Sequence, residues 1–176
     1  MKILLTLVLL FISISVFPQK RVNPVIKNYG GIFEIPYADE KPDPKLQYNI
    51  VIEVERANAT PDSVNWALHN VARMLNLHAM GDVPKNKLHV VLAIHGGASY
   101  TVMNNDAYKA KYGVDNPNLG LYQELQQAGV KMFICGQSMI ARDIDPNKTV
   151  PEVKIATSML TTLTTYQLKG YALLKF

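Results

Sequence analysis

The sequence has little of the material from which disulfides and metal centres are built. Cys135 is the only cysteine in 176 residues, so the chain cannot close an intramolecular disulfide. His69, His78 and His89 have no second histidine or cysteine at a spacing typical of metal ligands, and we interpret them as structural or surface residues. The sequence therefore predicts neither a metal ion nor a cofactor.

Signatures of several common functions are also missing. No G-x-G-x-x-G fingerprint is present, which argues against dinucleotide binding. The segment HGGAS at residues 95–99 is like an oxyanion loop, but no G-x-S-x-G elbow accompanies it, which argues against a serine hydrolase. The net charge is only +4, and Lys and Arg are scattered rather than interleaved with aromatic residues, so we expect no nucleic-acid partner.

An apolar run long enough to span a membrane is missing as well. Residues 3–17 are apolar and follow the basic residue Lys2, but a membrane-spanning helix needs about 20 such residues. We predict that residues 1–19 are a secretory signal peptide, with an uncleaved N-terminal anchor as the alternative. The mature protein would then be exported to the periplasm and would have no membrane contact after cleavage.

The rest of the chain divides into a lead-in and one domain. Residues 20–45 are rich in proline and contain the pair Gly30–Gly31, which predicts an extended lead-in with a short edge strand or hairpin arm at residues 31–38. Residues 46–176 form the predicted α/β domain, in which β-rich runs alternate with helical patterns. Strands are expected at residues 46–54, 87–94, 130–135, 152–158 and 171–176, and the main helices at 59–81, 104–111, 116–129 and 159–170.

This alternation favours a three-layer α/β/α fold with a mostly parallel five-stranded sheet, flavodoxin-like in general layout. Thr60 is the expected N-cap of the first helix, with Pro61 in its first turn. We expect core packing for Trp66, and inward-facing positions in the last helix for Leu160, Leu163 and Leu168.

The carboxyl ends of the parallel strands predict the location of the site, because ligands bind at that edge of such a sheet. Asn58 follows the first predicted strand, and His95, Gly96 and Gly97 follow the second. The third strand ends in the block Cys135, Gly136, Gln137 and Ser138. We therefore expect the lone cysteine to lie near a histidine and near two turns that contain glycine.

Cys135 ends a strand and precedes a predicted helical turn, whose exposed amides would favour a thiolate. A thiol of low pKa with open access can attack sulfur electrophiles and carry a persulfide. Gly136 would leave room beside it for a bound group or a partner's backbone. The alternative is that Cys135 is a small buried hydrophobic residue, as free cysteines often are. Two roles are also open for His95: it could stabilise the thiolate, or it could be a packing residue at a strand end.

Long blocks of the chain have the pattern of one known family. They include "ELQQAGVKMFICGQSM", "VPEVKIATSMLTTLTTYQLKGYAL" and "LHVVLAIHGGASYTVMNNDAYKAKYG", and the similarity extends over residues 24–176. On these blocks the sequence resembles the DsrE/DsrF-like family, which includes the YchN-type proteins. The "CGQS" and "HGGA" blocks, together with "QLKGYAL", make it similar to an exported subgroup of that family.

The resemblance implies a three-layer α/β fold and a homo-oligomer, such as a trimer or hexamer. It also implies sulfur relay, in which a cysteine at a strand end carries persulfide sulfur between partners, and Cys135 occupies that position here. The implied partners are sulfur donor and acceptor proteins or small thiols. The sulfur-relay members act inside the cell, whereas this chain has a predicted signal peptide.

Two functional hypotheses follow. In the first, Cys135 is the catalytic residue of a sulfur carrier or sulfurtransferase. His95, Gly96, Gly97, Gly136, Gln137, Ser138 and Asn58 are then its predicted site neighbours. In the second, the protein is a non-catalytic oligomeric module that binds a small ligand in the same crevice, and the cysteine is structural.

Overall fold

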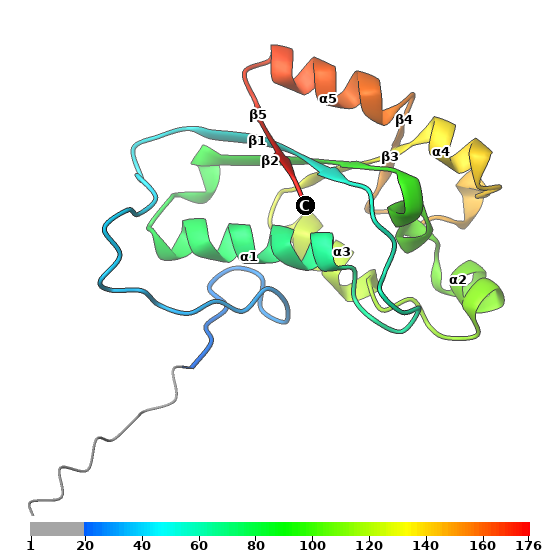
Figure 1. The fold of residues 1–176 in the computed structure, drawn as a ribbon, viewed down its shortest axis with the longest axis horizontal. Coiled ribbons are helices and arrows are strands. Elements are labelled where there is room, and N and C mark those ends of the chain that lie inside the picture. Colours follow the sequence, from blue (N-terminus) through cyan, green and yellow to red (C-terminus); the bar gives the residue numbers. More distant parts are fainter. Residues whose placement is uncertain (1–19) are drawn as a thin grey trace, which may run out of the picture.

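The computed structural model describes residues 20–176, so the predicted signal peptide at residues 1–19 lies outside the described part of the chain. Five parallel strands form one sheet in the order β4-β3-β2-β1-β5 (Figure 1). They are β1 Tyr48–Val54, β2 Leu88–Ile94, β3 Lys131–Cys135, β4 Lys154–Ala156 and β5 Ala172–Lys175. The predicted α/β fold with a parallel five-stranded sheet is confirmed.

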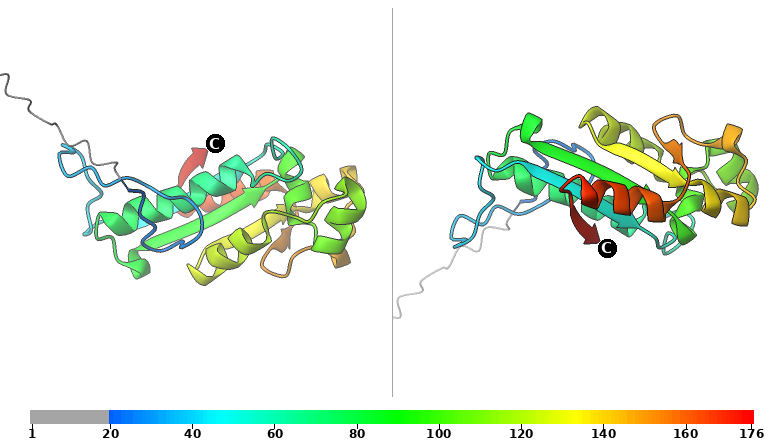
Figure 2. Two further views of the ribbon diagram at one scale, coloured as in Figure 1. Left: turned by 90° about the horizontal axis from the view of Figure 1, so that it is seen from below. Right: turned by 90° about the horizontal axis from the view of Figure 1, so that it is seen from above.

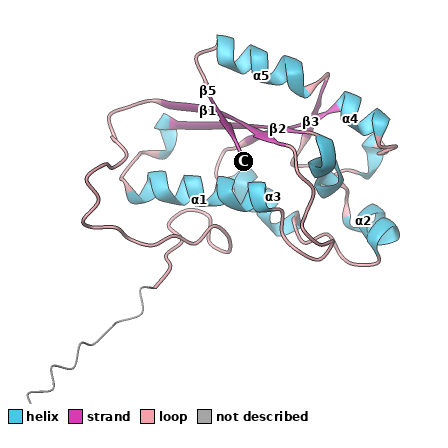
Figure 3. Ribbon diagram, viewed as in Figure 1, coloured by secondary structure: helices cyan, strands magenta, loops and turns pink. Residues whose placement is uncertain are grey.

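Helices cover both faces of this sheet. The helices are α1 Trp66–Met80, α2 Asn105–Tyr112, α3 Leu119–Gln127, α4 Gly136–Ala141 and α5 Met159–Leu168, with 3-10 turns η1 Lys85–Lys87, η2 Gly96–Val102 and η3 Pro146–Lys148. Figures 1 and 3 show α1 and α3 below the sheet and α5 alone above it, and Figure 2 gives the two perpendicular views. Within residues 20–176 no helix has the length and apolar character needed to cross a membrane.

The two faces of the sheet belong to two separate apolar clusters. Alternate residues of a strand point to opposite faces. Ile50, Ile52 and Val54 of β1 therefore join the large core under α1 and α3. Val51 faces the other way and packs with Val91 of β2 and Leu163 of α5. Because one short helix covers the second face, this smaller cluster leaves polar groups close to the surface near the strand ends.

Helix α1 begins later than the sequence pattern predicted. Its N-cap is Asn65, whose side-chain oxygen accepts hydrogen bonds from the amides of Ala67 and Leu68. Thr60 is not the cap: it forms a separate turn, in which its amide donates to Ser63 Oγ and its carbonyl accepts from the Ser63 amide. The amide of Asn65 donates to Asn118, a contact between distant parts of the chain that local pattern cannot predict.

Three apolar side chains that we expected to be buried are exposed. Leu163 of α5 packs inward, but Leu160 and Leu168 are 68% and 90% exposed. Trp66 is 60% exposed and meets Phe176 edge to face, with ring centroids 6.3 Å apart. For the two leucines the reason is that α5 has only the sheet beneath it. One row of side chains, which includes Leu163, packs on the sheet, and the side chains on the rest of the helix face solvent.

The lead-in at residues 20–45 has little regular structure but packs on the domain. An antiparallel bridge joins Val22 to Ile32, and Ile26 and Ile32 are buried. Gly30 has a φ of +65°, and a Cβ there would lie 2.4 Å from the amide nitrogen of Arg73 in α1. Only glycine allows this close approach of loop and helix.

Asn76 of α1 binds the lead-in to the domain. Its side chain is fully buried, and its oxygen accepts hydrogen bonds of 2.9 Å from the amides of both Val25 and Ile26. Its amide group is within 3.2 Å of the carbonyl oxygens of Ile26, Tyr29 and Gly30. One side chain thus satisfies the backbone of a turn that has no strand or helix of its own.

We predict that Asn76→Leu lowers the free energy of unfolding by about 2–4 kcal/mol, because buried backbone groups lose their partner. Arg73→Ala, at an exposed position of the same helix, should change it by no more than about 0.5 kcal/mol. Urea denaturation followed by circular dichroism measures both variants. An Asn76→Leu protein as stable as wild type would contradict the prediction.

Candidate functional site

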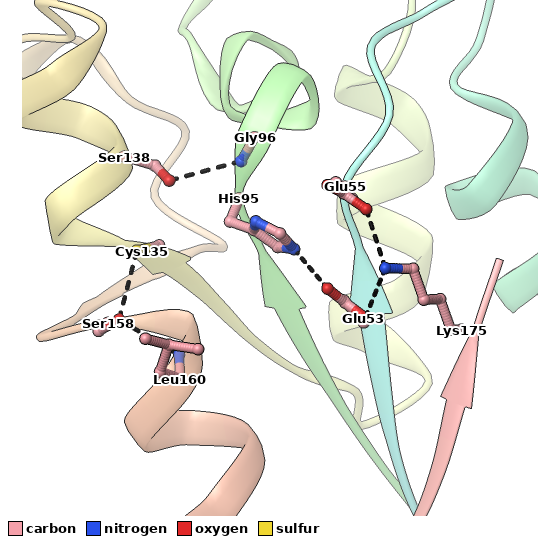
Figure 4. A network of polar contacts seen from close by, with 9 residues as sticks. All are labelled: Glu53, Glu55, His95, Gly96, Cys135, Ser138, Ser158, Leu160 and Lys175. Atoms are coloured by element: carbon pink, nitrogen blue, oxygen red, sulfur yellow. Dashed lines mark hydrogen bonds and ion pairs between the residues drawn. The ribbon is translucent and has the colours of Figure 1, made fainter.

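The candidate site lies at the carboxyl edge of the sheet, on the face that α5 covers. Glu53 of β1 is in register with Ala93 of β2 and Lys175 of β5. His95 comes two residues after Ala93, and Cys135 comes two residues after Phe133, the β3 partner of Ala93. The period of two therefore places Glu53, His95, Lys175 and Cys135 on one face. Figure 4 shows these side chains together.

Cys135 lies where two helices begin. It is the residue before α4, and the first residue of α5 is Met159. The sulfur is within hydrogen-bonding reach of the backbone amides of Ser138 and Met159. Both amides belong to the first turns of their helices, where N–H groups have no partner within the helix and carry partial positive charge. The two amides therefore favour a negative charge on the sulfur.

Two serine hydroxyls also reach the sulfur. Ser158 Oγ is 3.9 Å from Cys135 Sγ and accepts a hydrogen bond of 3.2 Å from the Leu160 amide (Figure 4). Ser138 Oγ accepts from the Gly96 amide at 3.4 Å. Because each oxygen already accepts from a backbone N–H, each hydroxyl proton is free to point at the sulfur. In the thiol form Sγ donates to Ser158, and in the thiolate form the hydroxyl donates in return.

These contacts determine the direction in which the pKa of Cys135 moves. Burial raises the pKa because it penalises the charged form, but the hydrogen bonds from Met159, Ser138 and Ser158 outweigh it. The pKa of the Cys135 thiol therefore lies below its ordinary value. A lowered thiol pKa is the property expected of a reactive cysteine.

The expected open access to the sulfur is not present. Cys135 is buried and only 3% exposed. The reason is that α5 returns across the end of β3, so the same contacts that stabilise a thiolate also cover it. The cover is thin, because Ser138 and Ser158 are themselves half-buried and Gln137 is exposed.

His95 lies in a second polar cluster at the same edge. Its Nε2 is 2.9 Å from Glu53 Oε1, and the other oxygen of Glu53 is 3.1 Å from Lys175 Nζ. Lys175 Nζ is also 2.9 Å from Glu55 Oε2. The ring contact of His95 that the structure records is thus with a carboxylate rather than with the sulfur. The predicted role of His95 beside the thiolate stays a prediction.

The pKa values in this cluster reflect its pairing. The hydrogen bond and charge of Lys175 lower the pKa of Glu55, and the carboxylates of Glu55 and Glu53 raise that of Lys175. Glu53, Glu55 and His95 also offer ligand atoms within 4.8 Å of one another, a spacing that suits a metal ion. The Lys175 ammonium is hydrogen-bonded to both carboxylates, so their charge has a partner within the chain.

The glycines predicted as site neighbours lie where two segments of the chain approach each other closely. Gly96 has a φ of +57°, and a Cβ there would lie 2.8 Å from the Glu55 carbonyl oxygen. A Cβ on Gly136 would lie 3.0 Å from the Ala156 carbonyl oxygen, so the chain itself fills the space predicted for a bound group. A Cβ on Gly97 would lie 2.9 Å from the amide nitrogen of Ala57.

Asn58 belongs to a different group of residues. Its side-chain amide donates to the hydroxyl of Tyr108 at 3.1 Å, and both residues line a cavity whose lining does not include Cys135. Of the predicted neighbours, Ser138 therefore contacts the sulfur, Gly96 holds Ser138, and Asn58 faces a separate pocket.

Sequence reasoning missed Glu53, Lys175 and the amide of Met159. Glu53 is a buried charged residue inside an apolar strand, and that interruption of "IVIEV" was the available signal. Lys175 and Met159 had no comparable signal. Their importance depends on which strand pairs with β1 and on where α5 begins.

Two comparisons extend this description. The sequence profile of the DsrE/DsrF-like family matches residues 54–176. The chain belongs to this family. The match includes Cys135, His95 and Lys175 and begins at Val54, so Glu53, the rest of β1 and the lead-in lie outside it. No match was found among curated proteins.

Two solved structures share the fold. The ychN protein of E. coli has 20% identity and a TM-score of 0.54, and the alignment covers 73% of this chain and 99% of that one. MTH1491 of Methanobacterium thermoautotrophicum, described as a protein of unknown function, has 16% identity and a TM-score of 0.55, with the same coverage. At these identities the likeness shows the fold alone.

We predict that the thiolate of Cys135 forms at lower pH than that of a free cysteine, because the folded-state pKa is lowered. The rate of iodoacetamide alkylation, followed against pH by mass spectrometry, gives the apparent pKa. Ser138→Ala and Ser158→Ala should each raise it, since each removes a donor.

Thr164→Ala, on the exposed side of α5, is the matched control and should leave the pKa unchanged. An apparent pKa of wild type equal to or above that of the urea-unfolded chain would contradict the prediction.

Proposed function

We propose that this protein is a sulfur carrier or sulfurtransferase that holds sulfur as a persulfide on Cys135. The observation that carries the proposal is the set of hydrogen-bond donors around one sulfur, from Met159, Ser138 and Ser158. A thiolate and the terminal sulfur of a persulfide are both anions, and the same donors can stabilise either. Membership of the DsrE/DsrF-like family supports this reading, since the family is linked to sulfur relay.

The transfer is a thiol exchange in two balanced steps. The Cys135 thiolate attacks the outer sulfur of a donor persulfide, R–S–SH, so that a new S–S bond forms and R–S⁻ leaves. An acceptor thiolate then attacks the outer sulfur on Cys135, takes it as its own persulfide and restores the cysteine thiolate. No net oxidation occurs. The donor and acceptor are proteins or small thiols.

Burial of the sulfur requires a local opening for each step. Ser138 lies in α4, a helix of only six residues, and Ser158 lies at the first turn of α5. Short helices and helix ends open at low cost in free energy. His95 remains a proposed neighbour of the site that supplies positive charge when it is protonated.

A second candidate function is a non-catalytic oligomeric module that binds a small ligand and has a structural cysteine. The observation that favours it is the 3% exposure of Cys135. In that case Cys135→Ala would keep ligand binding, and the thiol would resist both alkylation and sulfur transfer in the folded protein.

The test of sulfur transfer is the intact mass of the folded protein after incubation with glutathione persulfide. We expect an adduct of one sulfur atom that is removed by excess thiol. Cys135→Ser should form none, because it has no thiol, and Ser138→Ala should form the adduct more slowly than wild type. Thr164→Ala serves as the control at wild-type rate. A folded wild-type protein that gains no sulfur would exclude the carrier function and favour the ligand-binding module.

We also propose that the protein is a homo-oligomer, such as a trimer or hexamer. Support comes from apolar side chains that are exposed on the elements surrounding Cys135. They are Ile140 of α4, Ile155 of β4 and Leu160 of α5. A neighbouring copy that covers these residues would remove a sizeable apolar area from water, and it would also enclose the segments that open at the cysteine.

Light scattering after size exclusion tests this proposal, with an expected mass of three or six chains. Ile155→Glu and Leu160→Glu should lower that mass by placing charge in an apolar contact. Tyr37→Glu, at an exposed position of the lead-in, should not. A monomeric wild-type protein would refute the assembly.

Export to the periplasm is the last part of the proposal. Its support is the sequence of residues 1–19, with a basic start and a short apolar run. In that compartment thiols tend to be oxidised, and the absence of a second cysteine prevents Cys135 from being lost to an intramolecular disulfide.

A further inference from the structure

Residues 154–176 cross one face of the sheet with few buried side chains. This segment begins as β4 at one edge of the sheet and ends as β5 at the other edge, and α5 lies above the sheet between them (Figure 1). Thr162 and Leu163 are the only buried residues between positions 154 and 176. Segments that bury so little of their surface open locally at a low cost in free energy. We call residues 154–176 the strap.

The strap covers the sulfur of Cys135. Its Met159 amide and Ser158 hydroxyl both reach the sulfur, and Cys135 is only 3% exposed. The other contacts of the sulfur come from Ser138 of α4. A reagent in solution can therefore reach the sulfur once the beginning of α5 has moved away from the end of β3.

The last strand of the strap has a weak hold on the sheet. All four residues of β5 are exposed, and the strand pairs with β1 alone. Its outer edge has no strand beside it within residues 20–176. A short edge strand of this kind has few contacts that oppose its release. Side-chain contacts between β5 and β1 therefore decide how firmly the strap is closed.

Lys175, the last residue of β5, makes such contacts. Its Nζ is 3.1 Å from Glu53 Oε2 and 2.9 Å from Glu55 Oε2, as Figure 4 shows. Glu53 is buried in β1, and its other carboxylate oxygen is bound to His95, so this partner is fixed in place. Lys175 is exposed, so its ammonium can return to water when β5 separates from the sheet. The two ion pairs are thus a contact that can form and break.

We propose that residues 154–176 are a strap that closes over Cys135 and that Lys175 is the latch that holds it shut. When Lys175 separates from Glu53 and Glu55, β5 can leave β1, and α5 can then move away from the end of β3. The strap regulates access to the sulfur-carrier site and rests on that proposed function for its purpose. Its opening is nevertheless a property of the folded chain, and it can be measured without a sulfur donor.

The experiment measures iodoacetamide alkylation of Cys135 at about pH 9.5, where the thiol is largely ionised because its pKa is lowered. Lys175 stays charged there, since its hydrogen bonds to Glu55 and Glu53 raise its pKa. The rate for the folded protein divided by that for the urea-unfolded chain gives an opening constant. Urea denaturation at the same pH gives the constant for global unfolding. We expect the opening constant to be at least about tenfold larger, because the strap opens without the rest of the domain.

Lys175→Met removes the ammonium and keeps an unbranched side chain. It should raise the opening constant about threefold or more, the effect of losing two ion pairs. The apparent pKa of Cys135 should not change, because Lys175 does not contact the sulfur. Glu55→Gln should act in the same direction by a smaller factor, since the pair with Glu53 remains.

Lys109→Met is the matched control, because it breaks an exposed ion pair with Asp115 outside the strap. It should leave the opening constant unchanged. The latch is refuted if Lys175→Met gives the same opening constant as Lys109→Met. The strap is refuted if the opening constant of the wild-type protein equals its global unfolding constant, because the sulfur is then reached only by complete unfolding. A faster Lys175→Met protein that still gains no sulfur from glutathione persulfide would support the strap and exclude the sulfur-carrier function.

Discussion

The parallel register of β1, β2 and β3 is the constraint on which the rest of this structure depends. It brings three strand ends to one edge and, through the period of two, turns Glu53, His95 and Cys135 to the same face. A shift of one residue in any of these strands would send its polar residue into the large core under α1 and α3. The register of the sheet therefore fixes the positions of the residues in both polar clusters.

The sulfur environment balances two opposing effects. Burial of Cys135 disfavours a thiolate, whereas the amides of Ser138 and Met159 and the two serine hydroxyls favour it. Both effects have the same origin, because α5 supplies the Ser158 and Met159 donors and also covers the sulfur. The same few residues therefore stabilise a thiolate and cover the sulfur that carries it.

Much of the fold was predictable because it rests on local pattern. The five strands and the position of Cys135 at a strand end follow from apolar runs bounded by glycine and polar residues. The errors arose where distant segments meet. Asn65 replaces Thr60 as the cap of α1 because Asn118 holds its backbone, and Leu168 is exposed because no helix within residues 20–176 packs on the outer side of α5.

The sequence by itself determined the α/β class, the order of strands and helices, and the placement of one cysteine at the carboxyl edge of the sheet. These features depend on apolar periodicity and on the rule that parallel strands end together. Only the tertiary structure decided what the sulfur contacts, that Lys175 pairs with Glu53, and that Asn58 lines a separate aromatic cavity. Such contacts join residues far apart in the chain, and their geometry depends on crossings of loops and helices that no local pattern encodes.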